Sequence, residues 1–371
     1  MWTDIILTAI LVAAVPLTIV WVSGDVNKYR KLVFVTLFLT FDLIMFGAFT
    51  RLTDSGLGCP DWPGCYGAAN PLISHAAISA AEAMMPQGPV THFKAWVEMI
   101  HRYLASSVGI LIFAQMVIAW TKRKQFEGSP NYATALLFFV CLQGAFGAWT
   151  VTLKLQPIIV TTHLLLGMGL LAMLVWLAAR IQASNPETQT KRVAHAALNL
   201  KWWACLAWLI LLVQIALGGW VSTNYAVLAC TDYPLCQGVL IPRMDFEQGF
   251  SLWRELGKTA SGDYLSFAAL TAIHWVHRNF AWLVVLSSGY VAFRARAIDG
   301  LSTIARLILV VLVVQFCTGL ANILLSWPLA VAVLHNGGAA LLLALLTVLN
   351  YRVQVPLISS ADKTDTEFET K

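Results

Sequence analysis

The feature that most constrains this chain is a series of long apolar stretches, several of which carry no charge over about 20 residues. The first reads "ILTAILVAAVPLTIVWVSG" over residues 6–24. As a helix, such a stretch crosses a hydrocarbon core of about 30 Å. The composition agrees, because 58% of the 371 residues are apolar and only 12% are charged. The sequence therefore predicts an all-α polytopic membrane protein.

We expect nine membrane-spanning helices. A cleavable signal peptide is the alternative for the first one, but no basic region precedes its apolar stretch and Asp4 is the only charge ahead of it. We therefore expect a retained helix there. The expected spans cover about residues 5–23, 33–50, 98–120, 132–152, 158–179, 203–222, 270–292, 304–326 and 330–350.

Lys and Arg are unequally divided between the two sides of these spans. Sixteen lie in the loops of one side and in the C-terminal tail, and six lie in the loops of the other side. Short cytoplasmic loops are enriched in Lys and Arg. The N-terminus and the large loops 51–97 and 223–269 are therefore expected in the periplasm of a bacterial inner membrane, and the C-terminus in the cytoplasm. The net charge of +5 does not indicate nucleic-acid binding, because the basic residues lie mainly in short loops.

The chain contains an internal repeat. Residues 47–65, "GAFTRLTDSGLGCPDWPGC", align at an offset of 171 with residues 218–236, "GGWVSTNYAVLACTDYPLC". Further matches follow in the same order: "MIHRYLA" with "WVHRNFA", "LQGAFG" with "VQFCTG", and "TTHLLLG" with "AVLHNGG". The repeat predicts two pseudo-symmetric four-helix transmembrane bundles and one extra N-terminal helix. The expected order is extra helix, first bundle, cytoplasmic linker, second bundle and charged tail, over residues 1–32, 33–180, 181–201, 202–352 and 353–371.

Each large outer loop contains two cysteines six residues apart: Cys59 with Cys65, and Cys230 with Cys236. An oxidising compartment favours a disulfide within each loop. A zinc ion shared by the two pairs is the alternative, although cysteine pairs that bind zinc are usually closer in sequence. The remaining cysteines are expected as small core residues inside helices: Cys141, Cys205 and Cys317.

Four histidines occupy matching positions in the repeat, two in each bundle: His101, His163, His277 and His335. Each lies near the outer end of its expected span, and polar groups at membrane depth are costly and indicate function. A neutral histidine that bonds a neighbouring helix is the alternative for any single one. Two imidazoles on different helices of one bundle can ligate haem iron, whereas a zinc or di-iron site would need more carboxylates than the bundles hold.

Small and basic residues accompany these histidines. Gly167 and Gly338 follow histidines of their own helices by four and three residues, and are expected to let a haem approach the helix. Arg102 and Arg278 directly follow a histidine and are expected to contact haem propionates. An anchor that extends to the membrane interface is the alternative for each arginine.

The two halves differ beside these histidines. Glu98 stands three residues before His101, whereas the counterpart of Glu98 is His274, three residues before His277. A carboxylate beside one site and a histidine beside the other indicate two different tasks. One half is expected to keep its haem, and the other to change it.

Over residues 33–352 the chain resembles the haem A synthase family. The resemblance is carried by "RLTDSGLGCPDWPGC", "EMIHR", "HWVHR", "TTHLLLG" and "VLHNGG". It implies oxidation of the C8 methyl group of haem O to a formyl group by successive hydroxylations, which gives haem A for terminal oxidases. The extra N-terminal helix departs from the shorter members of the family, so its role is open.

The resemblance also implies roles for individual residues. His277 and His335 would be the axial ligands of a resident haem b, and His101 and His163 those of the substrate haem O. Glu98 matches the acidic residue at the reacting site. Besides haem O and membrane lipid, the partners considered are a haem O synthase, an electron acceptor and a second copy of the chain.

Three other functions are alternatives to this one. A bis-histidine cytochrome b that only carries electrons would explain the four histidines but not the difference between Glu98 and His274. A thiol-oxidising membrane enzyme predicts a C-x-x-C spacing. A haem O synthase would need aspartate-rich motifs, which the sequence lacks.

Overall fold

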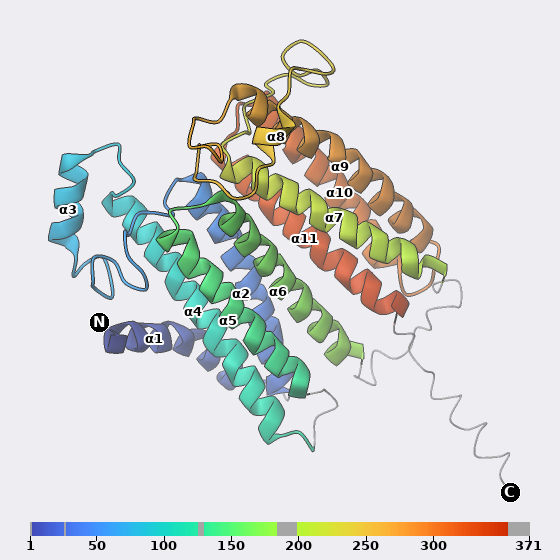
Figure 1. Cartoon of the computed structure of the whole chain (residues 1–371). Helices are drawn as coiled ribbons and strands as arrows, with labels where there is room; N and C mark the ends of the chain where they lie inside the picture. Colours follow the sequence, from blue (N-terminus) through green and yellow to red (C-terminus); the bar gives the residue numbers. More distant parts are fainter. Residues whose placement is uncertain (1, 26, 125–129, 184–198, 355–371) are drawn as a thin grey trace, which may run out of the picture.

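The computed structural model of the chain describes residues 2–25, 27–124, 130–183 and 199–354, and its regular elements there are helices. Much of the predicted linker and almost all of the predicted tail lie outside these residues. The helices are α1 (Trp2–Val22), α2 (Lys28–Leu52), α3 (His75–Met84), α4 (His92–Thr121), α5 (Pro130–Thr152), α6 (Pro157–Ala183), α7 (Lys201–Thr223), α8 (Phe246–Gly249), α9 (Phe267–Ala295), α10 (Ser302–Leu324) and α11 (Leu329–Gln354) (Figure 1). The all-helical prediction is confirmed.

Within the described ranges, eight helices are long and apolar enough to cross a membrane: α1, α2, α4, α5, α6, α7, α10 and α11. The ninth expected span corresponds to α9, which is not among the eight because His274, His277 and Arg278 interrupt its apolar sequence. We treat α9 as part of the membrane bundle because it packs along α7 and α10. The short helices α3 and α8 lie in the two large outer loops and were not predicted.

The long helices form two sets of four. In one set α2, α4, α5 and α6 pack on one another, and in the other α7, α9, α10 and α11 do. The sets lie side by side in Figure 1, and α2 and α6 of the first pack against α11 and α7 of the second. α6 and α11 are counterparts in the repeat and meet directly, and the contact of α2 with α11 is matched by that of α7 with α6, as a pseudo-two-fold relation between the sets requires.

Backbone conformation follows the same repeat. Cis peptide bonds and positive φ values recur at positions 171 residues apart in the outer segments. These positions are Pro63 and Pro234 for the cis bonds, and Asp54 and Tyr225, Tyr66 and Gln237, and Gly67 and Gly238 for positive φ. The two outer loops therefore share a fold near the cysteines.

Local signals fix where several helices begin. Thr91 caps α4 by accepting a hydrogen bond from the Lys94 N–H at 3.2 Å, and Ser266 caps α9 in the same way. Proline begins α5 and α6, where its missing N–H has no cost. Because α4 begins at His92, ahead of the expected residue 98, Glu98 lies in its second turn and not at its start.

The extra helix α1 packs on the first set, against α4 and α2. Its buried side chains Ala13, Pro16 and Val20 lie on one face, and Val20 joins a small core with Leu32 and Leu111. Most of its remaining apolar side chains are exposed, as expected where lipid surrounds a helix.

Candidate functional site

Each of the four repeated histidines lies with its ring edge against a glycine of a neighbouring helix. The Cβ atom that alanine would add lies 3.0 Å from Cε1 of His101 at Gly47, 3.1 Å from that of His163 at Gly147, 2.9 Å from that of His277 at Gly218, and 3.0 Å from that of His335 at Gly319. These separations are shorter than ordinary van der Waals contact. Any larger residue at these four positions would displace the imidazole beside it. Because the four distances are nearly the same, the four rings occupy equivalent positions.

The rings form two pairs. His101 on α4 and His163 on α6 are near enough to interact electrostatically, and so are His277 on α9 and His335 on α11. Each pair therefore joins two helices of one set. The ligation of a haem iron by each pair stays a prediction.

The imidazole nitrogens of these pairs are poorly satisfied by the protein. Nδ1 of His101, His163 and His277 is buried without a hydrogen-bond partner, whereas Nδ1 of His335 lies 3.0 Å from Oγ1 of Thr318. Among the described residues, no three His, Cys, Asp or Glu side chains are grouped to hold a bare metal ion. Two imidazoles per bundle, each seated on a glycine, fit the axial ligation of haem iron.

The cysteines of the outer loops form the two predicted disulfides, Cys59–Cys65 and Cys230–Cys236. All four residues are fully buried. Ile78 of α3 packs in one buried cluster with Cys59 and Cys65, so this short helix contacts the first disulfide loop.

Glu98 and His274 hold the two loops in equivalent ways. Oε2 of Glu98 accepts a hydrogen bond from the N–H of Cys59 at 2.8 Å, and Nδ1 of His274 accepts one from the N–H of Cys230 at 3.2 Å. Glu98 is only 4% exposed, and its Oε1 lies 2.5 Å from the guanidinium of Arg102. The carboxylate thus brings a negative charge to a position where the second half has an imidazole.

The two arginines that follow a histidine also bind the loops. Arg102 donates to the carbonyls of Asp61 and Pro63 at 3.0 and 3.2 Å. Arg278 donates to those of Asp232 and Pro234 at 2.9 and 2.8 Å. These contacts replace the interfacial anchor considered above, while the expected contacts with haem propionates stay a prediction.

Of two expectations about small residues, the one for Gly167 and Gly338 stays a prediction, and the one that places the remaining cysteines in the core was wrong. Gly167 and Gly338 lie against the side chains of Gln143 and Gln315, and the glycines that face the rings are on other helices. The sequence does contain a signal for the ring-facing glycines, which is a glutamine four residues before the glycine. It occurs in "QGAFG", "QIALG" and "QFCTG", whereas the fourth counterpart, "LIMFG" (43–47), begins with leucine. Cys141 and Cys317 are exposed and Cys205 is partly buried, because these side chains lie on outer helix faces that lipid can cover.

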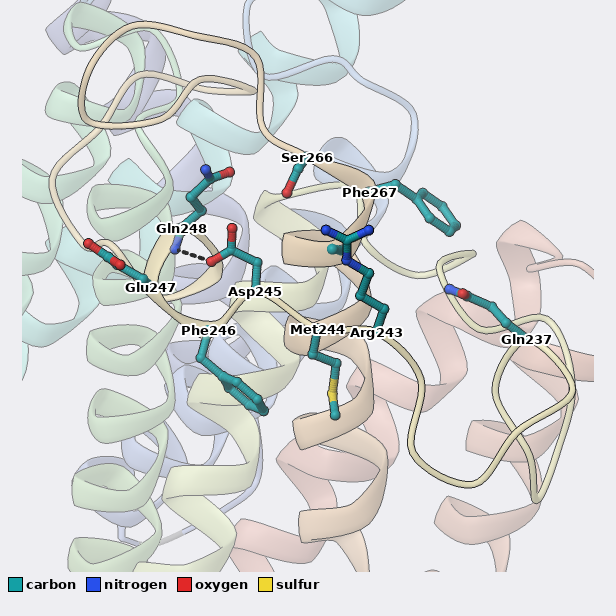
Figure 2. A pocket seen from close by; sticks show the side chains of 10 residues that line it. Gln237, Arg243, Met244, Asp245, Phe246, Glu247, Gln248, Ser266 and Phe267 are labelled. Atoms are coloured by element: carbon teal, nitrogen blue, oxygen red, sulfur yellow. Dashed lines mark hydrogen bonds between the residues drawn. The ribbon is translucent and has the colours of Figure 1, made fainter.

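A separate pocket of about 710 Å³ lies in the outer part of the second half, around α8 and the start of α9 (Figure 2). None of the predicted site residues lines it. It is therefore distinct from the histidine pairs. Its lining consists of Gln237, Arg243, Met244, Asp245, Phe246, Glu247, Gln248, Ser266, Phe267 and Ala268.

Residues 30–347 match the family model COX15-CtaA, which is described as cytochrome oxidase assembly protein. A heme A synthase of Shewanella oneidensis is 37% identical over 322 residues, which are 85% of this chain and 94% of that protein. Heme A synthases of a Caulobacter species and of Rhizorhabdus wittichii are each 29% identical, over 87% and 86% of this chain and 95% and 92% of their own lengths.

Proposed function

The chain belongs to the COX15-CtaA family of cytochrome oxidase assembly proteins, and on this premise we propose that it is a haem A synthase. It converts haem O to haem A, the haem of terminal oxidases. The observation that supports this most is the pair of buried, glycine-seated imidazoles in each bundle, with the buried carboxylate Glu98 beside only one pair.

In this proposal the two halves have different tasks. His277 and His335 would hold a resident haem b, and His101 and His163 would hold haem O as substrate. The haem supplies redox chemistry that side chains lack. The C8 methyl group of haem O would lose four electrons to an electron acceptor in two successive hydroxylations, each of which adds one oxygen atom, and the hydrated aldehyde would then lose water to leave the formyl group.

The residues around the first pair bind, orient and move protons. Oxidation of a methyl group releases protons, and the Glu98 carboxylate, one turn from His101, can accept them. Arg102 forms an ion pair with the buried Glu98 carboxylate and so holds that side chain in place beside the first pair. Arg102 and Arg278 would contact haem propionates through donors that the loop carbonyls leave unused.

The chain is a multi-pass membrane protein. We propose that the disulfide loops face the periplasm of the bacterial inner membrane and that the C-terminus is cytoplasmic, because Lys and Arg predominate on that side. The proposed partners are haem O, lipid, an electron acceptor, a haem O synthase and a second copy of the chain.

Pigment analysis tests the function directly. Cells that make haem O but no haem A would express this protein, and their acid-extracted haems would be separated by chromatography. We expect haem A only when the protein is present, and not with His101→Ala. A b-type spectrum without any haem A would instead favour an electron carrier.

A further inference from the structure

The hydrogen bonds around the four histidines are unequal between the halves. In the second half, Nε2 of Gln214 donates to the carbonyl of His277 at 3.0 Å, and Nε2 of Gln315 donates to the carbonyl of His335 at 2.9 Å. Thr318 adds a hydroxyl contact to the His335 ring at 3.0 Å.

The first half has fewer such contacts. The counterpart of Gln214 is Leu43, and the counterpart of Thr318 is Phe146. Within the part of the chain that the structure describes, neither His101 nor His163 has a hydrogen bond with another side chain. Phe46 instead stacks beside the His101 ring, with 6.3 Å between ring centroids.

The contact of Thr318 has a defined direction. Its hydroxyl proton is donated to the carbonyl of Gln315 at 3.1 Å, so its oxygen accepts the proton of Nδ1 of His335 at 3.0 Å. A proton held on Nδ1 leaves the lone pair of Nε2, which lies 3.5 Å from the amide nitrogen of Gln315, for a metal. Such outer partners fix the ring and raise the basicity of the ligand. Phe146 offers no hydroxyl to His163.

We propose that Thr318 is a positioning residue that fixes His335 for haem retention, with Gln214 and Gln315 holding the backbone of the same pair. Leu43 and Phe146 leave the first pair less constrained, so that a haem there can enter and leave. The second statement rests on the proposed function, since only a substrate site needs exchange. The first concerns haem retention alone.

The test uses the full-length protein purified with its haem. Thr318→Val removes the hydroxyl at nearly constant volume, and Thr318→Ser restores it. The measurements are the rate of haem transfer to excess apomyoglobin and the midpoint potential of the low-spin haem. We expect transfer from Thr318→Val to be roughly 10-fold faster or more, in line with the loss of a metal-ligand partner. Its potential should rise, because a less basic imidazole stabilises ferric iron less. Thr318→Ser should resemble the wild type.

Thr347→Val is the matched control. Thr347 is a buried threonine of α11 whose hydroxyl accepts from Trp208 and donates to Leu343, away from the rings. It should change neither quantity. Unchanged transfer and potential in Thr318→Val would overturn the proposal, as would equal effects of Thr347→Val, or faster transfer without a shift in potential.

The reciprocal variant tests exchange. Leu43→Gln with Phe146→Thr should slow haem transfer from the first pair, and an unchanged rate would overturn the second statement. Neither measurement involves turnover. If the chain formed no haem A but Thr318→Val behaved as expected, the proposed haem A synthase function would be wrong and the proposed role of Thr318 in haem retention would remain.

Discussion

At the scale of single residues, Glu98 combines a shared role with one of its own. Accepting the Cys59 N–H is the role that His274 fills toward Cys230 in the other half. The negative charge is specific to Glu98, and it is buried and paired with Arg102. A substitution can therefore separate the loop contact from the charge.

Glu98→Gln should keep the loop and lose the reaction. The amide oxygen can still accept the Cys59 N–H, but the side chain can no longer accept a proton. We expect haem A formation to fall by about 100-fold or more, as for loss of a general base. The ratio of haem A to haem O reports this, and an unchanged b-type spectrum controls for folding. Near-normal haem A would remove Glu98 from the mechanism.

The glycines beside the rings give a second prediction. Gly147→Ala should displace the His163 ring, because the new Cβ would lie 3.1 Å from Cε1. We expect a cost of about 1–3 kcal/mol in the free energy of unfolding and weaker haem binding by the first pair. Gly144→Ala, on the same helix, is the control, since a Cβ there meets no atom within 4 Å. Thermal unfolding and bound haem compare the two, and equal effects would show that the ring contact is unimportant.

At the scale of elements, the disulfide loops are built as rigid units over the histidine pairs. Asp232 accepts hydrogen bonds from the N–H groups of Gln237 at 2.7 Å and Gly238 at 2.9 Å, and Asp61 makes the equivalent contacts with Tyr66 and Gly67. The carboxylates thus fold each loop back on itself just after the second cysteine.

The second loop should loosen in acid. The N–H of Gly238, followed by that of Gln237, lowers the pKa of Asp232 below its usual value. The loosened loop therefore binds protons more readily than the folded one, so the stabilisation is complete above the usual aspartate pKa of about 3.9 and is lost as the pH falls through the lowered value. The rate at which a phosphine reduces the Cys230–Cys236 disulfide, measured across this pH range, reports how far the loop has loosened. Asp232→Asn should be reduced faster at neutral pH and lose the acid dependence; a wild-type profile in that variant would contradict this.

The two short helices and α9 show where sequence patterns are insufficient. α3 is an alanine-rich helix within a loop, and it is too short to be recognised by a membrane-length apolar stretch. In α9, His274, His277 and Arg278 lower the hydropathy of the helix, although the repeat still indicated its place. The repeat was thus a stronger guide there than composition.

At the scale of the whole molecule, counterpart residues of the two halves meet directly. Arg51 donates to the carbonyl of Ser222 at 2.8 Å and to the hydroxyl of Tyr225 at 3.0 Å, and that hydroxyl donates to Asp54 at 2.7 Å. Arg51 and Ser222, and Asp54 and Tyr225, are 171 residues apart. The pseudo-two-fold axis therefore passes close to this cluster at the outer ends of α2 and α7.

Arg51→Ala should weaken the union of the halves. The arginine makes two hydrogen bonds across the boundary and stacks over Tyr225, so we expect a loss of about 1–3 kcal/mol in the free energy of unfolding. Thermal unfolding in detergent measures it. Arg243→Ala, which removes an exposed arginine of the second outer loop, is the control. An equal melting temperature for both variants would show that Arg51 does not couple the halves.

Much of this architecture could be predicted because the length of the apolar stretches, the Lys and Arg bias and the repeat can all be read directly from the sequence. The contacts of the site could not, since they depend on which helices face each other. Gly47 and His101 lie on different helices, and nothing in "LIMFG" says that its glycine meets a ring. Likewise, only the packed structure shows that Arg102 binds loop carbonyls.

The division of labour between the halves is the central claim, and haem content per protein tests it most directly. Single alanine variants of His101, His163, His277 and His335 would be purified, and their b-type spectra and bound haem measured. We predict that His277→Ala and His335→Ala lose most of the resident haem, whereas His101→Ala and His163→Ala keep it. Equal loss from both halves, or loss confined to the first, would contradict the account.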